Sequence, residues 1–435
     1  MPYADSPFLL EWLLMDKFRV QLYEESQVMQ FTLDSRGGRE FSIRKRSGVL
    51  TRNFDGSWNS RAVETGSREE AARALSWKSG ARLEAEPLGL PVDAGEILDA
   101  NGFLTQFLQR LDPQEWRLLF RAGCTRRLIR NTRRQDVRNS SRHFSVTARL
   151  KPRGQSEELE IGEGAAEELK FNLDGLTQRI AGAVEDQKHR RRVAFSGPVP
   201  VVLQAGEGAI LFHEILGHAL EADYVYQGVS PFTRADLGRA IVPETITILC
   251  RDERDPFFRD VAVDDEGEPR AGPLLVERGV LRRFISDYAH QKLLRLPERG
   301  HARLENFACI PQPRMFATYV QPGAVPQAEI VASTPFGVYA REFGDGGIDM
   351  ASGRFYFRIR QPYLIEKGRL AAPIAPLTVS GGMRDILSDM DMVGDDFKYD
   401  RGTSYCQKNG QVLSVRVGQP TVKIAKLWVR GGQDA

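Results

Sequence analysis

The segment from Gly206 to Ala222 constrains this chain more than any other, because it joins a helical apolar pattern to a cluster of metal-binding residue types. Its centre reads HEILGH at residues 213–218. The chain has six histidines, so a His-Glu-x-x-x-His pattern has a chance probability on the order of one in a hundred or less. We therefore interpret this helix as the centre of a functional site.

Two imidazoles beside one carboxylate suit the chemistry of a zinc hydrolase. Neutral imidazole nitrogens bind zinc, and an open coordination position can hold a water that the metal makes more acidic. In this interpretation His213 and His218 bind Zn²⁺, and Glu214 is the catalytic base that takes the proton of the water. The alternative is a helix with two partly buried histidines, each satisfied by an ordinary hydrogen bond. We favour the metal site because the three groups occur together in an apolar helix.

The spacing of the two histidines makes a geometric prediction. Histidines four residues apart lie about 400° around an ideal helix and face the same way, whereas a spacing of five is about 500° and separates them by about 140°. A wide π-type turn with i→i+5 hydrogen bonds would realign them. Gly217, directly before His218, would add backbone freedom there. We therefore predict a local distortion of the helix between His213 and His218.

Two histidines do not complete a catalytic zinc site, which usually has three protein ligands. Composition leaves the third ligand open among His290, His301, the acidic residues and the cysteines. Glu221 and Asp223 either orient the ligands from outside the coordination shell or are exposed charges at the helix end.

The rest of the chain predicts an α+β fold with two domains. Residues 1–193 have a mixed α/β pattern, with alternating strand segments at 29–33 and 41–43. Helices are expected at 67–77, at 101–111 and within 169–193. After residue 193, short apolar runs are separated by glycine and proline, which indicates a strand-rich domain over 194–435 that carries the metal-binding helix.

The stretch from Arg117 to Arg153 is strongly basic, with twelve Lys or Arg residues and one acid, Asp136. One interpretation is a surface for nucleic acid or an acidic partner. The other is a set of two or three strands whose solvent face is basic, offset by the acidic run from Glu157 to Glu168. We favour the second, because no RNA-binding signature or zinc-finger spacing accompanies the charges, and we do not expect nucleic-acid binding.

Composition indicates a cytoplasmic protein. The four cysteines are far apart and form no CxxC pair, which favours a reducing compartment. Residues 1–17 contain acids within their apolar patch and do not resemble a signal peptide. No run of about 18 apolar residues occurs, so we expect no transmembrane helix.

Several motifs after residue 195 follow the HEILGH segment in an order that resembles the TldD/PmbA family, in particular its metal-binding TldD branch. They are GxSxF at 228–232, VDDEG at 263–267, GVL at 279–281, PRM at 313–315, TY at 318–319, GVYA at 337–340, DxxSG at 349–353, MVGDD at 392–396 and VGQPT at 417–421. The resemblance covers roughly residues 195 to 435 and is much weaker before them.

The resemblance implies a zinc peptidase that acts on short or unfolded peptides. It also implies that the third zinc ligand is Cys406, in the sequence YCQKNGQ at 405–411. Family members often have Cys-Gly-Lys here, whereas this chain has Gln407 after the cysteine. A thiolate is a suitable zinc ligand.

The resemblance further implies dimers that enclose the active site, formed with a second copy or with a paralogue that lacks the motif. A peptide bound along an exposed strand edge is a reasonable hypothesis, since main-chain hydrogen bonds do not depend on side chains. We interpret the glycine-rich stretch FGDGG at 343–347 as a tight turn rather than a flexible rim beside that edge.

Two other functions remain open on the sequence. One is a non-catalytic modulator or partner-binding protein, in which the zinc is structural and the basic N-terminal segment docks a partner. The other is a different zinc hydrolase, such as an amidase that acts on modified peptides.

Overall fold

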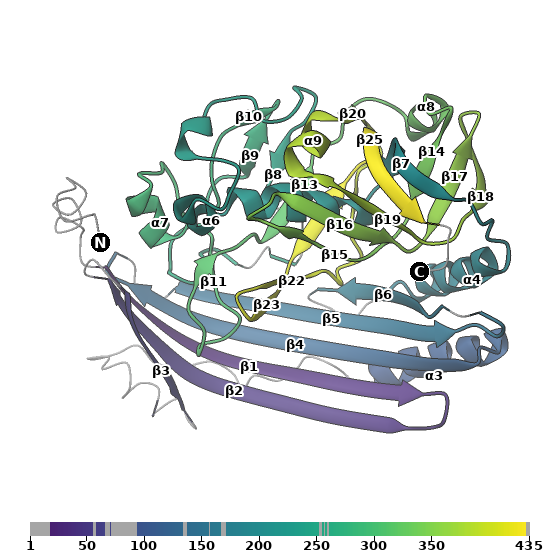
Figure 1. Cartoon of the computed structure of the whole chain (residues 1–435). Helices are drawn as coiled ribbons and strands as arrows, with labels where there is room; N and C mark the ends of the chain where they lie inside the picture. Colours follow the sequence, from purple (N-terminus) through teal and green to yellow (C-terminus); the bar gives the residue numbers. More distant parts are fainter. Residues whose placement is uncertain are drawn as a thin grey trace.

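The computed structural model describes residues 18–54, 58–65, 70, 94–133, 137–155, 157–166, 171–251, 255, 257–258 and 261–431. Its fold is of the α+β class, with an antiparallel sheet in the N-terminal part and several sheets in a strand-rich C-terminal part. The two parts lie one above the other (Figure 1). The α+β class and the strand-rich C-terminal part both agree with the prediction from the sequence.

The N-terminal part is a six-stranded sheet in the order β3-β2-β1-β4-β5-β6, with antiparallel neighbours throughout. Its elements are β1 (Phe18–Asp34), β2 (Arg39–Phe54), β3 (Trp58–Glu64), α3 (Ala94–Leu111), β4 (Glu115–Asn131), β5 (Val137–Lys151), β6 (Leu159–Ala165) and α4 (Leu173–Lys188). Alternating apolar residues on long strands such as β4 place one set of side chains on each face.

The two faces of this sheet have different neighbours. On one face Leu118 and Val146 pack with Leu104 of α3 and Ile180 of α4 in a buried apolar cluster. On the other face, residues from β1 and β4 such as Leu22 and Ile129 join a second cluster with Tyr288 and Leu304 of the C-terminal part. The sheet therefore lies between its own helices and the C-terminal part.

The C-terminal part contains many short elements. They are β7 (Phe195–Leu203), a 3₁₀ turn (Glu207–Ala209), α5 (Ile210–Phe212), a π-turn (His213–Gly217), a 3₁₀ turn (His218–Leu220), α6 (Ala222–Gln227), a 3₁₀ turn (Arg234–Asp236), β8 (Ile248–Leu249), β9 (Leu274–Glu277), β10 (Val280–Leu281), α7 (Tyr288–Leu293), β11 (Ala302–Arg303), β12 (Gln312–Pro313), β13 (Ala317–Val320), α8 (Gln327–Ala332), β14 (Phe336–Ala340), β15 (Phe343–Asp349), β16 (Arg354–Ile359), β17 (Pro362–Glu366), β18 (Arg369–Pro373), β19 (Leu377–Gly382), α9 (Met383–Ser388), β20 (Met390–Val393), β21 (Lys398–Tyr399), β22 (Tyr405–Lys408), β23 (Gln411–Ser414), β24 (Arg416–Gln419) and β25 (Val422–Gly431).

A nine-stranded sheet is the main scaffold of this part. Its order is β15-β16-β19-β25-β7-β14-β17-β18, and β20 also pairs with β25. β15 is therefore an edge strand. A second sheet has the order β10-β9-β8-β13-β24-β21. The largest apolar cluster joins the nine-stranded sheet to the helical segment that holds Leu211, Ile215 and Leu216, so this segment is anchored in the core.

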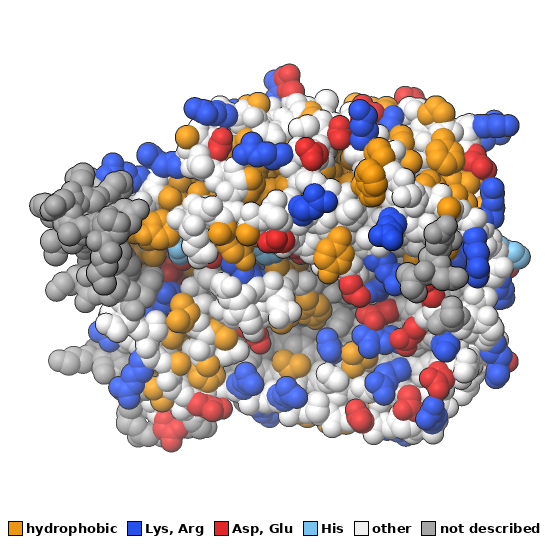
Figure 2. Space-filling model, in the orientation of Figure 1, with side chains coloured by type: hydrophobic (Ala, Val, Ile, Leu, Met, Phe, Trp, Pro, Cys, Tyr) orange, Lys and Arg blue, Asp and Glu red, His pale blue; other side chains and the backbone are white. Residues whose placement is uncertain are grey.

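Charged side chains also connect the two parts. Arg127 of β4 donates to Glu24 and to Asp265, each at 2.9 Å, and Arg52 of β2 lies 3.1 Å from Glu266. Figure 2 shows acidic and basic side chains interspersed over the lower half of the face in view, with a hollow between this half and the upper one.

The basic segment of residues 117–153 forms parts of β4 and β5, as the favoured interpretation of that segment requires. One of its arginines, Arg149, pairs with Glu160 of the acidic run at 2.7 Å. Arg127 is mostly buried in the contact between the two parts rather than offered to a partner.

The predicted helix at 101–111 ends as expected but begins earlier, at Ala94, and the helix within 169–193 is α4. The predicted helix at 67–77 lies outside the described residues apart from Glu70, and residues 1–17 also lie outside them. No helix in the described part of the chain is long and apolar enough to cross a membrane.

The interpretation of residues 343–347 as a tight turn is wrong, because these residues belong to edge strand β15. Its glycines have a packing reason instead. A Cβ atom at Gly346 would overlap the ring of Phe357, and one at Gly344 would lie too close to the Arg360 side chain. The pairing of β15 with β16 is irregular between Phe343 and Gly346.

Candidate metal centre

The helix carrying the two histidines contains the predicted distortion. Residues His213–Gly217 form a π-turn, and the backbone N–H of His218 donates to the carbonyl of His213, five residues earlier. This wide turn brings the two rings to the same side, with their centroids 5.2 Å apart and their planes at 82°. The geometric prediction is therefore confirmed.

Gly217 is required for a different reason from the one expected. Its φ of −55° and ψ of −54° are ordinary helical values that any residue can adopt. However, a Cβ atom at this position would overlap the sulfur of Met315. Gly217 thus permits a close approach between the π-turn and Met315, and it supplies no unusual backbone conformation.

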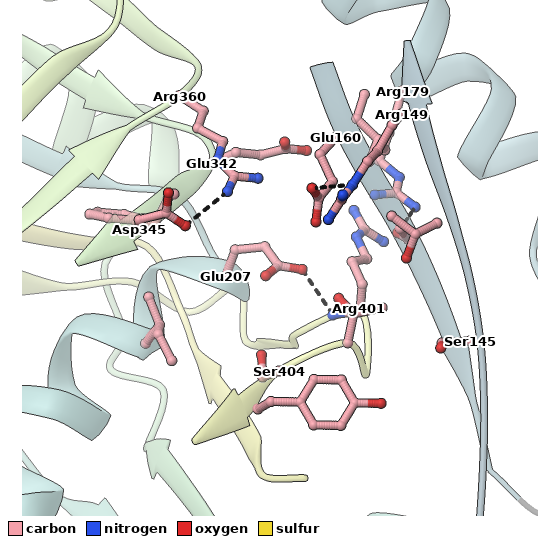
Figure 3. A pocket seen from close by; sticks show the side chains of 18 of the residues that line it. Ser145, Arg149, Glu160, Arg179, Glu207, Glu342, Asp345, Arg360, Arg401 and Ser404 are labelled. Carbon is pink, nitrogen blue, oxygen red and sulfur yellow. Dashed lines mark hydrogen bonds and ion pairs between the residues drawn. The ribbon is translucent and has the colours of Figure 1, made fainter. Parts of the chain in front are cut away.

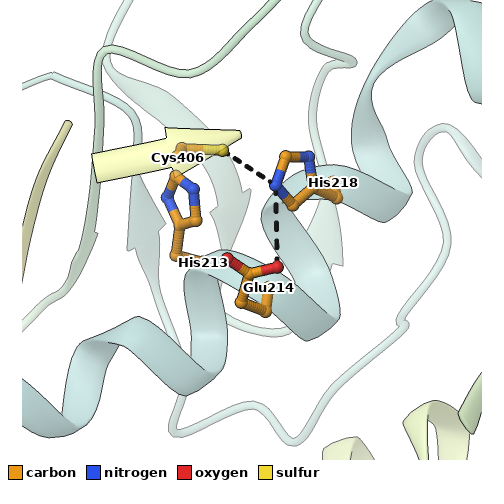
Figure 4. A group of neighbouring side chains, drawn as sticks. All are labelled: His213, Glu214, His218 and Cys406. Carbon is orange, nitrogen blue, oxygen red and sulfur yellow. Dashed lines mark hydrogen bonds and ion pairs between the residues drawn. The ribbon is translucent and has the colours of Figure 1, made fainter. Parts of the chain in front are cut away.

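Four side chains converge at this turn, as Figure 4 shows. One potential ligand atom from each of His213, Glu214, His218 and Cys406 lies within 4.8 Å of the others. Cys406 Sγ is 3.1 Å from His218 Nε2, and the same nitrogen is 3.7 Å from Glu214 Oε2. The cysteine comes from β22, which reaches the helix from late in the chain.

The donor set fits a borderline-soft cation such as zinc. His213 Nε2 is buried and has no hydrogen-bond partner of good geometry in the part of the chain that the structure describes. A buried nitrogen without a partner is costly unless a ligand satisfies it. Two imidazoles and a thiolate are zinc ligands, and the Glu214 side chain, which is 18% exposed, is the most accessible of the four.

Each imidazole is held through its other nitrogen. His213 Nδ1 lies 3.3 Å from Thr318 Oγ1, and His218 Nδ1 lies 2.8 Å from Glu221 Oε2. These contacts leave both Nε2 atoms directed to the centre and fix the orientation of the rings. Of the two interpretations of Glu221, the structure therefore supports the one in which it orients a histidine.

Lys408 extends this arrangement. Its ammonium donates to Glu221 Oε2 at 2.9 Å and to Asp223 Oδ1 at 2.8 Å. Arg314 in turn donates to the carbonyl of Cys406 at 2.7 Å. Sequence reasoning did not assign a role to Lys408 or Arg314, although Arg314 occurs in a motif that carries the family resemblance and Lys408 is two residues after Cys406. The alternation of β22 was an available signal, because it places Cys406 and Lys408 on the same buried face.

Electrostatics within the cluster favour a thiolate and charged neighbours. Burial alone would raise the pKa of Cys406, but the imidazoles of His218 and His213 outweigh it and hold this pKa well below its usual range. Burial would also raise the pKa of Glu221, yet Lys408 and His218 lower it to about 2. Glu221 is therefore an anion that can accept the N–H of His218.

The other histidine and cysteine candidates for a third ligand lie elsewhere. His290 Nδ1 is 2.7 Å from Asp287, and His301 Nε2 is 3.4 Å from Cys250. Cys124 and Cys309 are not part of the cluster. Cys406 is thus the one candidate of these types that the described structure brings to His213 and His218.

Comparison with known proteins places this geometry in context. The protein-family model for the PmbA/TldA metallopeptidase C-terminal domain matches residues 196–431 of this chain. A Metalloprotease TldD homolog of Buchnera aphidicola subsp. Acyrthosiphon pisum is 32% identical over 306 residues, covering 68% of this chain and 63% of that protein. A Zinc metalloprotease TldD homolog of Saccharolobus solfataricus is 30% identical over 237 residues, covering 54% and 52%. The chain spans less than two thirds of the length of these curated relatives.

Solved structures share the fold over almost the whole chain. TldE from Thermococcus kodakarensis aligns with a TM-score of 0.73 at 16% identity, covering 98% of this chain and 100% of that one. A putative modulator of a DNA gyrase from Thermotoga maritima aligns with a TM-score of 0.74 at 17% identity, covering 97% and 99%. At these identities the likeness concerns the fold alone.

Proposed function

The chain belongs to the TldD/PmbA family of metallopeptidases, and on that premise we propose that it is a zinc-dependent peptidase that hydrolyses short or unfolded peptides. The observation that carries the proposal is the convergence of His213, His218 and Cys406 on one point, with Glu214 beside it. Two segments far apart in the sequence meet there and bring their potential ligand atoms together. Two buried histidines that only made ordinary hydrogen bonds would not require this arrangement.

In this proposal His213, His218 and Cys406 bind the metal and Glu214 is the general base. A bound zinc ion would supply a Lewis acid that polarises the scissile carbonyl and makes water more acidic. Glu214 takes the proton of the attacking water and returns it to the leaving amine. Glu221 holds the His218 ring in place, and Lys408, which also donates to Asp223, stabilises Glu221.

The position of β15 supports an extended substrate. β15 is at the edge of the nine-stranded sheet and contacts the π-turn that bears Glu214. A peptide that pairs with this edge would be held through its main chain, with its carbonyl groups beside the metal centre. Such a binding mode suits unfolded peptides of varied sequence, because the backbone supplies the hydrogen bonds.

We also propose the division of the chain into domains at residues 1–193 and 194–435, and assembly as a homodimer or with a paralogue that lacks the HExxxH motif. Light scattering on the purified protein, alone and with such a paralogue, tests the assembly. A monomer under both conditions contradicts it.

Substitution of Glu214 by Gln tests the catalytic role. The variant keeps the shape of the side chain but cannot accept a proton, so we expect peptide cleavage to fall by about 10² to 10⁴-fold while zinc content stays the same. Cleavage at the wild-type rate by this variant would exclude Glu214 as the base. An absence of cleavage by the zinc-loaded wild type, across a panel of unstructured peptides, would instead favour the modulator function.

Substitution of Cys406 by Ser tests the ligand set. A serine hydroxyl is a poor zinc ligand. The zinc content of the purified variant, measured by elemental mass spectrometry, should therefore be lower than the one equivalent per chain expected for the wild type. Cys309→Ser is the matched control, because Cys309 is outside the cluster. Full zinc occupancy in Cys406→Ser would remove Cys406 from the site.

A further inference from the structure

The segment that leads into β22 is held by the N-terminal sheet as well as by the C-terminal part. In the described part of the chain, β6 is at the edge of the N-terminal sheet, so one side of its backbone is not paired with another strand of that sheet. The backbone N–H of Gly164 in β6 donates to the carbonyl of Arg401 at 2.6 Å. Arg401 is five residues before Cys406. The N-terminal sheet therefore contacts the chain close to the proposed thiolate ligand.

The contact at Gly164 is a close approach of two backbones. A Cβ atom at Gly164 would overlap the carbonyl group of Gly402. Gly402 itself has a φ of 75°, in the left-handed region that favours glycine. Backbone atoms cannot turn away as the end of a long side chain can. The sheet and the segment are therefore fitted together without room for a methyl group.

The backbone of Arg401 also connects this contact to the helical segment that bears the histidines. Its N–H donates to Oε1 of Glu207 at 2.9 Å, and Glu207 begins the 3₁₀ turn directly before α5. Figure 3 shows Glu207 and Arg401 joined in this way, near Ser404, in the wall of a cavity between the two parts of the molecule. One residue thus joins the N-terminal sheet, the helical segment and the chain that leads to Cys406.

A second contact from the sheet reaches the residue next to the cysteine. The hydroxyl of Tyr405 lies 3.0 Å from Nε2 of His143 on β5, and the two rings pack edge to face with centroids 5.7 Å apart. Successive residues of a strand point to opposite faces, so Tyr405 is directed to the sheet while the buried Cys406 is directed to the metal centre. The sheet therefore holds β22 on the face opposite to the ligand.

The turn between these two contacts is cross-linked by its own hydrogen bonds. Ser404 Oγ donates to Asp400 Oδ2 at 2.7 Å, and the same oxygen accepts the backbone N–H of Gly402 at 3.2 Å. Asp400 also pairs with the buried Arg416 at 2.6 Å. Because such a turn moves as a unit, a displacement at its contact with the sheet is passed on to Cys406. Zinc–ligand distances hold to within about 0.2 Å, so a small displacement weakens the ligand.

We propose that the N-terminal sheet positions Cys406 for metal binding, through the contact of Gly164 with Arg401 and the contact of His143 with Tyr405. Gly164 and His143 are then positioning residues, because they act through the segment 401–405 and do not contact the metal. The inference rests on the proposed zinc centre. It gives the N-terminal part of the chain, where the family resemblance is weak, a role in the chemistry of the site.

Gly164→Ala in the full-length protein tests the backbone contact. The added methyl group displaces Gly402, so we expect zinc affinity, measured by competition with a chromogenic chelator, to fall roughly 10- to 100-fold. With Co²⁺ in place of zinc, the thiolate-to-cobalt charge-transfer absorption should weaken or shift, since it depends on the contact between sulfur and metal. A merely structural role would lower stability in urea but leave this absorption of the folded protein unchanged.

Gly123→Ala is the matched control. Gly123 is on β4 of the same sheet, and a Cβ atom there would lie 3.9 Å from its nearest neighbour, the carbonyl oxygen of His143. That is an ordinary contact, so this variant should keep the zinc affinity and the cobalt absorption of the wild type. A folded Gly164→Ala variant that behaves like Gly123→Ala would overturn the proposal.

His143→Phe and Tyr405→Phe test the second contact, and they carry the test alone if circular dichroism shows that Gly164→Ala does not fold. Each variant keeps an aromatic ring but loses the contact between the hydroxyl and the ring nitrogen, so zinc affinity should fall roughly two- to tenfold. The double variant should lose no more than Tyr405→Phe alone, because both changes remove the same contact. Unchanged affinity in the single variants, or losses that add, contradicts the assignment.

The two proposals fail in different ways. If the wild type binds Co²⁺ without a thiolate absorption, or Cys406→Ser keeps that absorption, the proposed metal centre fails. If the absorption depends on Cys406 but is the same in Gly164→Ala and His143→Phe, only the positioning by the sheet fails.

Discussion

The ammonium of Lys408 lies 2.9 Å from Oε2 of Glu221, the same oxygen that lies 2.8 Å from Nδ1 of His218. One cation thus stabilises the anion that orients a proposed metal ligand. Lys408 is also two residues after Cys406 on β22. A single side chain therefore links the strand that brings the thiol to the helix that brings the imidazoles.

Lys408→Met should weaken zinc binding. The substitution leaves Glu221 and Asp223 buried without their shared cation, so the support of the His218 ring is reduced. Loss of such an outer contact typically lowers metal affinity by roughly 10- to 100-fold, which competition with a chromogenic chelator measures. Lys188→Met is the control, because Lys188 forms an exposed pair with Glu185. An unchanged zinc affinity in Lys408→Met would show that the contact has no role in metal binding.

Gly217→Ala should destabilise the protein although alanine is the better helix former. The added methyl group would overlap Met315, and such overpacking costs about 1–3 kcal/mol. Urea unfolding measures the effect. Gly182→Ala in α4 is the matched control: it has open space around the Cβ position and should be neutral or stabilising by roughly 0.5–1 kcal/mol. Equal responses at the two positions would disprove the packing role of Gly217.

Glu207→Gln should raise stability at alkaline pH. Burial raises the pKa of Glu207 from its ordinary value of 4.5 to about 7, so the folded state binds the proton more tightly than the unfolded state. The stabilisation from that proton is complete below pH 4.5 and is lost as pH rises through 7. Glutamine does not ionise, so at pH 8 the variant should gain up to about 3 kcal/mol over wild type, at about 1.4 kcal/mol per pKa unit.

Unfolding by urea at pH 4.5 and pH 8 checks this expectation. The two proteins should have similar stability at the lower pH and differ at the higher one. A difference that does not depend on pH would mean that the substitution acts through packing.

Arg127→Met should destabilise the contact between the N-terminal sheet and the C-terminal part. Arg127 is the shared partner of Glu24 and Asp265, and removing it leaves two buried carboxylates without a cation. Breaking a buried pair costs about 3–5 kcal/mol, to be measured by chemical unfolding. Arg153→Met is the control, since Arg153 and Asp112 form an exposed pair, and it should change stability little. Similar effects in both variants would argue against a structural role for the buried cluster.

The geometry of the helix was predictable because the spacing of His213 and His218 converts directly into an angle. The position of Cys406 was not predictable from spacing, since 188 residues separate it from His218. Only the family resemblance pointed to this cysteine, and the structure brings it to the two imidazoles. Long-range convergence of this kind depends on how distant segments pack in three dimensions, which local sequence patterns do not contain.

Two errors have a common physical origin. In the sequence, the glycines of β15 indicated a turn and Gly217 indicated a flexible backbone, because glycine adopts backbone conformations that other residues avoid. In the structure, Gly346 and Gly217 are instead close to the side chains of Phe357 and Met315. A sequence shows that a Cβ atom is missing but not which neighbour occupies the space.

The distance in sequence between the donor atoms has a consequence for biogenesis. On a ribosome, His213 and His218 emerge long before Cys406, and two imidazoles alone are an incomplete coordination set. The proposed zinc ion would then enter only when β22 has reached the helix. Metal uptake would therefore be a late maturation step that distinguishes finished molecules from nascent ones.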